Sequence, residues 1–309
     1  MSTAGATAST LGSRLARRPL SESWRRRLPL LPALLFTIVL TQVPFVMSVY
    51  YSLTDWKVVP PEPRRWVGLH NYGQLFHDHF FADAALTTVQ LTVFPVVGSL
   101  VLGSAFALLL DRRFFGQGVV RTLLITPFLM MPVVVGLIWK NQMFNGLYGV
   151  LNWVIEKLGA NGVDFVSRYP TLSLVIVLIW QWTPFMMLIV LAGLQSQPAD
   201  VIEAAKVDGA SASGIFRQLT VSHLRPYLQL GILLGTIYLI QVYDLIAVMT
   251  GGGPGSTNVP YFVFQRSIGG GWDFGEASSY SIVVVVASII IATIALRVLS
   301  GLLKGEEIA

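Results

Sequence analysis

The chain of 309 residues is 54% hydrophobic and only 12% charged, and its formal net charge at pH 7 is +5. Soluble chains carry about 25% charged residues, so this composition excludes an ordinary soluble domain and predicts that most of the chain faces lipid or other apolar helices. The absence of cysteine excludes disulfides, thiolate nucleophiles and cysteine-ligated metals.

Six strongly apolar intervals contain no charged residue, and they are 18 to 31 residues long. A helix needs about 20 apolar residues to cross the hydrocarbon core of a bilayer. We therefore expect an all-α membrane protein with six transmembrane helices. The expected spans are about 28–51, 84–110, 122–139, 171–194, 227–243 and 278–299.

The two ends of the chain are expected to be cytoplasmic tails. Residues 1–27 are polar and basic, and we expect them to be disordered. The apolar stretch that follows is too long for the core of a cleaved signal peptide, so span one is expected to remain as an anchor. Residues 304–309 form the second tail, and the membrane domain is expected to cover 28–303.

The distribution of Lys and Arg predicts the orientation. With a cytoplasmic N-terminus, the inner segments contain 14 of these residues and the outer loops contain 7. Positive residues accumulate on the cytoplasmic side of membrane proteins. We therefore expect a multi-pass protein of the inner or plasma membrane with both termini inside. The same inner cations account for the net charge, so no nucleic-acid partner is expected.

Three outer segments were considered as sites. The loop 140–170 has an amphipathic pattern, which predicts a short helix lying on the membrane surface or against a partner. His77-Asp78-His79 lacks a third ligand cluster, so a solvated loop is preferred to a metal site. Gly251 to Thr257 lacks the lysine of a nucleotide-binding loop, and a flexible outer loop that caps a pathway is expected instead.

The inner loop 195–226 is predicted to be organised. A first helix is expected to begin near Gln197-Pro198 and to break at Asp208-Gly209, and a second is expected to end at Arg225-Pro226. Such a compact pair of helices fits a groove on another protein.

This loop carries the clearest resemblance to a known family. Glu203-Ala204-Ala205, Asp208-Gly209-Ala210, Phe216 and Pro226 have the spacing that resembles the EAA loop of binding-protein-dependent ABC importer permeases. Val221-Ser222 departs from the Leu-Pro that is common there, which leaves the bend of the second helix open.

Shorter motifs resemble the carbohydrate branch of these permeases. Thr250 to Gly255 looks like the first permease of the maltose transporter. Phe115 to Arg121, Trp139-Lys140-Asn141 and Trp180 to Phe185 resemble mannitol and sorbitol permeases.

The resemblance implies a MetI-like ABC importer permease fold and a transmembrane permease subunit for a carbohydrate or sugar alcohol (polyol). It implies no enzyme activity and no cofactor in this chain. The implied partners are a second homologous permease, two ATPase subunits or an ATPase homodimer that bind ATP and Mg, and an extracytoplasmic solute-binding protein. The implied ATPase-coupling residues are Glu203, Ala204, Ala205, Asp208, Gly209, Ala210 and Phe216.

Polar and aromatic residues within two spans are candidates for the substrate pathway, because polar groups inside a membrane face the protein interior or a wet cavity. Amides and carboxylates bind sugar hydroxyls, and aromatic rings stack on sugar C–H faces. Interhelical hydrogen bonding and interfacial anchoring remain the alternative, and Asp244 is also open as a gate or loop residue. The candidates are Gln181, Trp182 and Phe185 in span four, and Tyr238, Gln241 and Asp244 in span five.

Two other classes of function were weighed. An ion-coupled secondary transporter acting without an ATPase tends to contain internal repeats and intramembrane ionisable residues. Neither is seen here apart from Asp244. An intramembrane enzyme is disfavoured because the chain has no cysteine, no H-E-x-x-H motif and no histidine inside an expected span.

Overall fold

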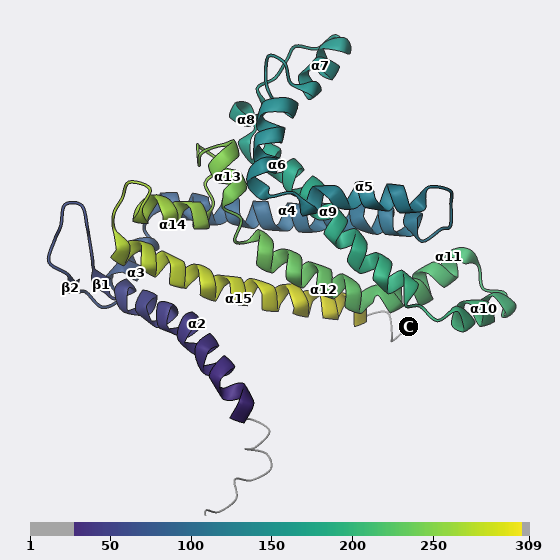
Figure 1. Cartoon of the computed structure of the whole chain (residues 1–309), viewed down its shortest axis with the longest axis horizontal. Helices are drawn as coiled ribbons and strands as arrows, with labels where there is room; N and C mark the ends of the chain where they lie inside the picture. The colour runs from purple at the N-terminus through teal and green to yellow at the C-terminus, as the bar shows by residue number, and fades with distance from the viewer. Residues whose placement is uncertain (1–27, 305–309) are drawn as a thin grey trace, which may run out of the picture. The chain divides into compact units, whose positions relative to one another are not determined.

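The computed structural model describes residues 28–304 (Figure 1). The chain divides into two units, residues 1–47 and 48–309. Most of the helix α2 (Leu31–Ser52), preceded by the single turn η1 (Leu28–Leu30), belongs to the first. The hydroxyls of Thr37 and Thr41 donate to carbonyls of the preceding turn, so these polar groups are satisfied within the apolar helix. The expected tail at 1–27 lies outside the described residues, and so does the expected tail at 304–309 except for Lys304, which ends α15.

The second unit is built around α4 (His79–Leu110) and α9 (Pro170–Gln195), which pack along much of their length. The helix α12 (Val221–Leu239) packs on both, and α15 (Phe274–Lys304) packs on α12. In the most apolar 18-residue stretch of each helix, the buried share is 61% for α9, 33% for α4 and 17% for α15. The helix α9 is therefore central, and the others leave apolar surface for lipid or partner chains.

Short elements connect these helices. In the described part of the chain the strands are β1 (Thr54–Asp55) and β2 (Arg65–Trp66), which form one antiparallel ribbon with Thr54 opposite Trp66. The expected all-α class is therefore confirmed apart from this ribbon. The short helices are α3 (His70–Leu75), α5 (Gln117–Leu129), α6 (Pro132–Ile138), α7 (Val150–Lys157), α8 (Phe165–Arg168), α10 (Ala199–Val207), α11 (Ala212–Gly214), α13 (Asp244–Met249) and α14 (Val259–Ser267), and the π-helical segments are η2 (Trp139–Met143) and η3 (Ile215–Thr220).

The number of long apolar helices differs from the expected six. Within residues 28–304, four helices are long and apolar enough to cross a membrane, or up to five if α5 and the segment from Pro132 to Met143 form one broken span. The region of the expected span at 122–139 is bent, because these two parts meet at an angle of 100°. The residue before a proline avoids the helical region, and Met131, which precedes Pro132, is extended with ψ 135°. In Figure 1, α6 and α7 accordingly extend away from the direction of α4, α12 and α15.

The expected span 227–243 also differs. The helix α12 begins earlier, at Val221, ends at Leu239, and is followed by a break and the short α13. The second helix of the inner loop was expected to stop at Arg225-Pro226, but it continues through η3 into α12 with Pro226 inside the helix. Leu224 is only 5% exposed and packs on α9, so tertiary packing outweighs the cost of the proline.

Candidate functional site

A central cavity of about 350 Å³ lies where α5, α9, α12 and α13 meet. Five of the six residues expected in the substrate pathway line it, and they come from α9, from the end of α12 and the break after it, and from the start of α13. Phe185 does not line the cavity, but its ring stacks on Phe128 at 5.2 Å between centroids. The lining residues are Phe128, Met130, Pro132, Leu178, Gln181, Trp182, Tyr238, Gln241, Val242, Tyr243, Asp244 and Leu245.

The cavity lies at two breaks in the helical structure, and side chains from elsewhere in the fold satisfy the backbone there. The Gln181 amide donates to the carbonyl of Met130 over 3.4 Å. The Asn258 amide donates to the carbonyl of Val242, between α12 and α13. Unpaired backbone groups are costly away from water, so both amides stabilise the non-helical backbone around the cavity.

One wall of the cavity is aromatic. The ring of Trp182 lies 5.6 Å from Tyr238, 5.6 Å from Phe128 and 5.5 Å from Phe185, measured between centroids. Tyr238 is 58% exposed, so its ring remains accessible. This cluster provides flat apolar faces next to polar groups, an arrangement that suits ligands with both C–H faces and hydroxyls.

The polar groups of the cavity differ in their surroundings. Gln181 is only 5% exposed. The Gln241 amide donates to the Ile237 carbonyl at 3.0 Å. Asp244 is exposed and is the first residue of α13. The cavity therefore has two carboxamides and one carboxylate that can exchange hydrogen bonds with a polar ligand.

Sequence reasoning missed a residue that holds α13 in place. The sequence places Lys140 only among the outer charges and in the Trp139-Lys140-Asn141 motif, but its ammonium group donates to the Val248 carbonyl near the C-terminal end of α13 at 3.0 Å. Gly136 of α6 lies against Val248 and Leu245, so α6 and α13 pack closely. The sequence signal that could have identified Lys140 is its position as a lone cation directly after an apolar interval. Tyr243 was also missed as a cavity residue, although it directly precedes Asp244.

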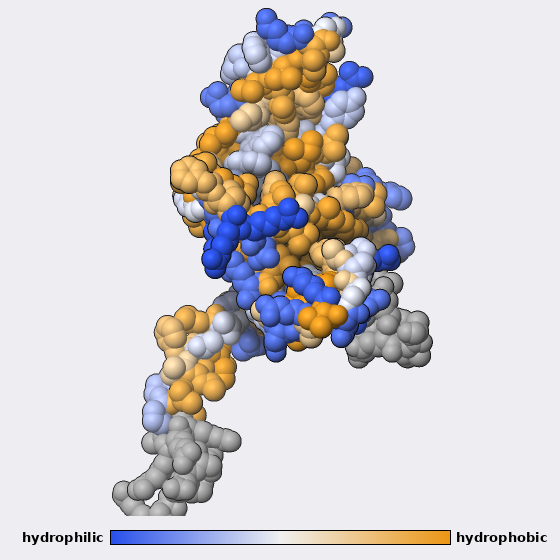
Figure 2. All heavy atoms as spheres, turned by 90° about the vertical axis from the view of Figure 1, so that its right-hand side faces the viewer, coloured by the Kyte–Doolittle hydropathy of each residue, from blue (hydrophilic) through white to orange (hydrophobic). Residues whose placement is uncertain are grey.

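The residues expected to couple to an ATPase lie on one exposed segment. The helix α10 contains Glu203, Ala204 and Ala205 and is closed by Asp208, whose N–H donates to the Ala204 carbonyl at 2.9 Å. Gly209 then has φ +80°, which permits the sharp bend before Ala210. Figure 2 shows the end of the molecule at which α10 and α11 lie in Figure 1, where hydrophilic and hydrophobic residues are mixed.

The apolar residues after the bend differ in their exposure. Ile215 is 9% exposed and Leu224 is 5% exposed. Phe216, by contrast, is 40% exposed within the π-helical η3. The structure therefore leaves Phe216 accessible to a partner, while Leu224 packs against α9.

The triplet His77-Asp78-His79 has a structural role. Asp78 caps α4 by accepting from the Phe80 N–H at 2.9 Å, and its other oxygen pairs with Arg266 at 2.9 Å. Among the described residues, no group of three His, Cys, Asp or Glu side chains is arranged to hold a metal ion.

Comparisons with known proteins agree on one family. Residues 99–303 match the model of the binding-protein-dependent transport system inner membrane component. The chain is 38% identical over 259 residues to a probable ABC transporter permease, y4oQ, of Sinorhizobium fredii, covering 83% of this chain and 84% of the relative. It is 34% identical over 283 residues to the trehalose/maltose transport system permease MalF of Thermococcus litoralis, covering 90% and 94%.

A third relative is the sulfoquinovosyl glycerol transport system permease SmoG of Agrobacterium fabrum, with 30% identity over 274 residues and coverage of 87% and 88%. Among solved structures, a chain of a bacterial alginate ABC transporter in complex with its periplasmic protein has a TM-score of 0.75 at 17% identity. That similarity covers 88% of this chain and 93% of the other, and it confirms the expected permease fold.

Proposed function

Since the chain belongs to the family of binding-protein-dependent transport system inner membrane components, we propose that it is a permease subunit of an ABC importer for a carbohydrate or sugar alcohol. Members of this family are inner-membrane transport subunits and not enzymes. Relatives named for trehalose/maltose and sulfoquinovosyl glycerol transport support a carbohydrate as the solute. Family membership also disfavours a secondary transporter that works without an ATPase.

The observation that carries this proposal is the convergence of Gln181, Trp182, Tyr238, Gln241 and Asp244 on one cavity. The amides and the carboxylate bind solute hydroxyls, and the rings of Trp182 and Tyr238 stack on the C–H face. The volume of about 350 Å³ lies at the small end of the range of about 300–1,000 Å³ for ligand sites. A cavity of this size suits a small sugar or polyol, with the partner permease completing the pathway.

The proposed assembly contains a second homologous permease, two ATPase subunits that bind ATP and Mg, and a solute-binding protein on the outer side. We place both termini in the cytoplasm and count α12 and the bent α5–α6 pair as spans, which makes six. The ATPases dock on the segment from Glu203 to Phe216 and move it as they close. This movement switches the cavity between inward and outward access.

The test is uptake of labelled trehalose, maltose and mannitol by the reconstituted importer. Gln181→Ala and Gln241→Ala each remove a hydrogen-bonding group from the cavity, a loss that typically amounts to about 0.5–1.5 kcal/mol. We expect the solute concentration for half-maximal uptake to rise about 3- to 10-fold in each variant, with normal retention of the ATPase.

Gln229→Ala is the matched control, because Gln229 lies on α12 but does not line the cavity. It should transport like the parent protein. Unchanged uptake by both cavity variants at limiting solute would remove these residues from the pathway.

A further inference from the structure

A second cavity, here called the outer polar pocket, lies apart from the central cavity. It has a volume of about 550 Å³ and is enclosed by the beginning of α4, by α14 and by the loop 252–257. None of its lining residues lines the central cavity. The residues that matter for its chemistry are Phe80, Asp83, Thr87, Gln90, Phe262 and Gln265.

Four polar side chains point to a ligand in this pocket. Asp83, Thr87 and Gln90 are spaced by four and three residues, which places them on one face of α4, and Gln265 comes from α14. Within residues 28–304, none of these four side chains has a hydrogen bond or an ion pair. Thr87 is only 6% exposed overall, but its unpaired hydroxyl is accessible at the pocket. A polar molecule bound in the pocket would supply its partner.

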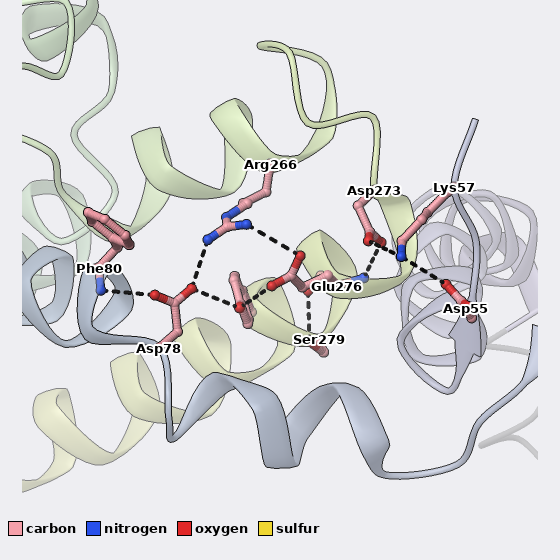
Figure 3. A network of polar contacts seen from close by, with 9 residues as sticks. Asp55, Lys57, Asp78, Phe80, Arg266, Asp273, Glu276 and Ser279 are labelled. Atoms are coloured by element: carbon pink, nitrogen blue, oxygen red, sulfur yellow. Dashed lines mark hydrogen bonds and ion pairs between the residues drawn. The ribbon is translucent and has the colours of Figure 1, made fainter. Parts of the chain in front are cut away.

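A network of charged residues fixes two walls of the pocket (Figure 3). Asp78 caps the start of α4 through the Phe80 N–H and pairs with Arg266 of α14. Arg266 also lies 3.7 Å from a carboxylate oxygen of Glu276 on α15, and the Tyr280 hydroxyl bonds to the same carboxylate group. The backbone at Phe80 and the α14 residues near Arg266 are therefore held in place before any ligand arrives, which lowers the ordering cost of binding.

The glycine-rich loop forms a third wall and is also tied down. The Thr88 hydroxyl accepts from the Val259 N–H at 2.9 Å, which joins the end of the loop to α4. The Thr171 hydroxyl donates to the Gly255 carbonyl, which joins the loop to α9. Ser256 is fully buried and donates to the Gly253 carbonyl at 2.8 Å. The expected flexible loop is thus an ordered wall in this structure.

The chemistry of the lining identifies the class of ligand. The four unpaired side chains are one carboxylate, two carboxamides and one hydroxyl, which offer both donors and acceptors, and the exposed ring of Phe80 offers an apolar face. No Lys, Arg or His lines the pocket, and the charge of Asp83 disfavours an anion. These groups suit the hydroxyls and C–H faces of a neutral, polyhydroxylated molecule.

We propose that the outer polar pocket is a second binding site for a neutral sugar or sugar alcohol, distinct from the central cavity. The choice of free sugars as ligands rests on the proposed function. In the proposed orientation the pocket opens at the outer end of α4, where solute arrives before it reaches the central cavity.

The experiment measures binding of trehalose, maltose and mannitol to the permease–ATPase complex in phosphatidylcholine nanodiscs by isothermal titration calorimetry, without the solute-binding protein. The double variant Thr87→Val, Gln90→Leu keeps the side-chain size but removes both hydrogen-bonding groups. We expect it to bind one sugar fewer per complex, or to bind that sugar at least 10-fold more weakly. Thr87→Ser keeps the hydroxyl and should bind like the parent.

Two further variants separate the sites. Gln181→Ala with Gln241→Ala should remove the other binding event, and Gln229→Leu should remove neither. The proposal is overturned if the Thr87→Val, Gln90→Leu complex assembles normally in size-exclusion chromatography and its binding isotherm is unchanged. If the parent complex shows the second sugar site only after lipid is replaced by detergent, a lipid headgroup occupies the pocket in the membrane. The proposal is then wrong. Failure of the proposed function would appear separately, as the absence of sugar uptake by the parent importer.

Discussion

At the scale of single residues, Gly252 links the ordered loop to the central cavity. Its φ is +67°, and an added Cβ would overlap the ring of Tyr261. The Tyr261 hydroxyl donates to the Gly251 carbonyl at 3.1 Å, and its ring stacks on Tyr243 at 5.5 Å between centroids. Because Tyr243 lines the central cavity, a change at Gly252 reaches the cavity through Tyr261.

Gly252→Ala should therefore impair both stability and transport. A residue other than glycine in this backbone region costs about 1–3 kcal/mol, and the overlap with Tyr261 adds to that cost. We expect a lower unfolding temperature in detergent and at least a several-fold loss of sugar uptake. Gly253→Ala is the matched control, because Gly253 does not have a positive φ and its Cβ would meet only the Thr250 carbonyl at 3.6 Å. Equal behaviour of the two variants would contradict this account.

At the scale of elements, the segment α10–η3 combines a glycine bend with an exposed aromatic residue. Gly209 has φ +80° but open space around its Cβ position, so a side chain there changes the bend without a clash. The η3 segment has the wider π-helical turns, which are frequent at functional sites. It carries exposed Phe216 next to buried Ile215.

Substitutions in this segment should separate docking from coupling. Phe216→Ala removes an exposed aromatic anchor, and loss of such an interface residue costs about 2 kcal/mol or more. We expect about 30-fold weaker retention of the ATPase, measured by co-purification in mild detergent. Gly209→Leu should keep most docking but lose sugar-stimulated ATP hydrolysis, because the strained bend misaligns the two helices.

Phe115→Ala is the control for the aromatic substitution, since Phe115 is fully exposed in the turn between α4 and α5. It should retain the ATPase like the parent. If Phe216→Ala, Gly209→Leu and Glu203→Ala all keep parental binding and coupled transport, the docking segment lies elsewhere.

At the scale of the whole molecule, the proposed orientation assigns opposite sides to two exposed segments. Tyr148, which lies just before α7, is 66% exposed and should face the outside. Ser211, the cap of α11, is exposed and should face the cytoplasm. Since the chain has no cysteine, single cysteines report accessibility without background.

In intact cells, a membrane-impermeant thiol reagent should label Tyr148→Cys but not Ser211→Cys, because the bilayer separates the two positions. Both variants should react after the membrane is permeabilised, which controls for local accessibility. Labelling of Ser211→Cys from outside in intact cells would invert the proposed orientation.

Properties that add up along a short stretch of chain were predictable from the sequence. The apolar character of α4, α9 and α15 depends on about 20 consecutive residues, and no distant partner is needed to recognise it. The motif from Glu203 to Phe216 is equally local, because its residues lie within 14 consecutive positions, and its role in coupling stays a prediction. For the same reason Gln181, Tyr238 and Gln241 were recognisable as polar or aromatic residues inside apolar segments.

The tertiary structure alone decided where the helices break and what meets at the breaks. The expected span at 227–243 contains no proline, and its sequence gives no signal for the break at 240–243. At this break the Asn258 amide donates to the Val242 carbonyl. Gln181 and Met130 are 51 residues apart, and Arg266 and Asp78 are 188 apart. Such pairs form only when packing brings distant helices together. The central cavity, the outer polar pocket and the ordered loop therefore follow from the fold and not from any local pattern.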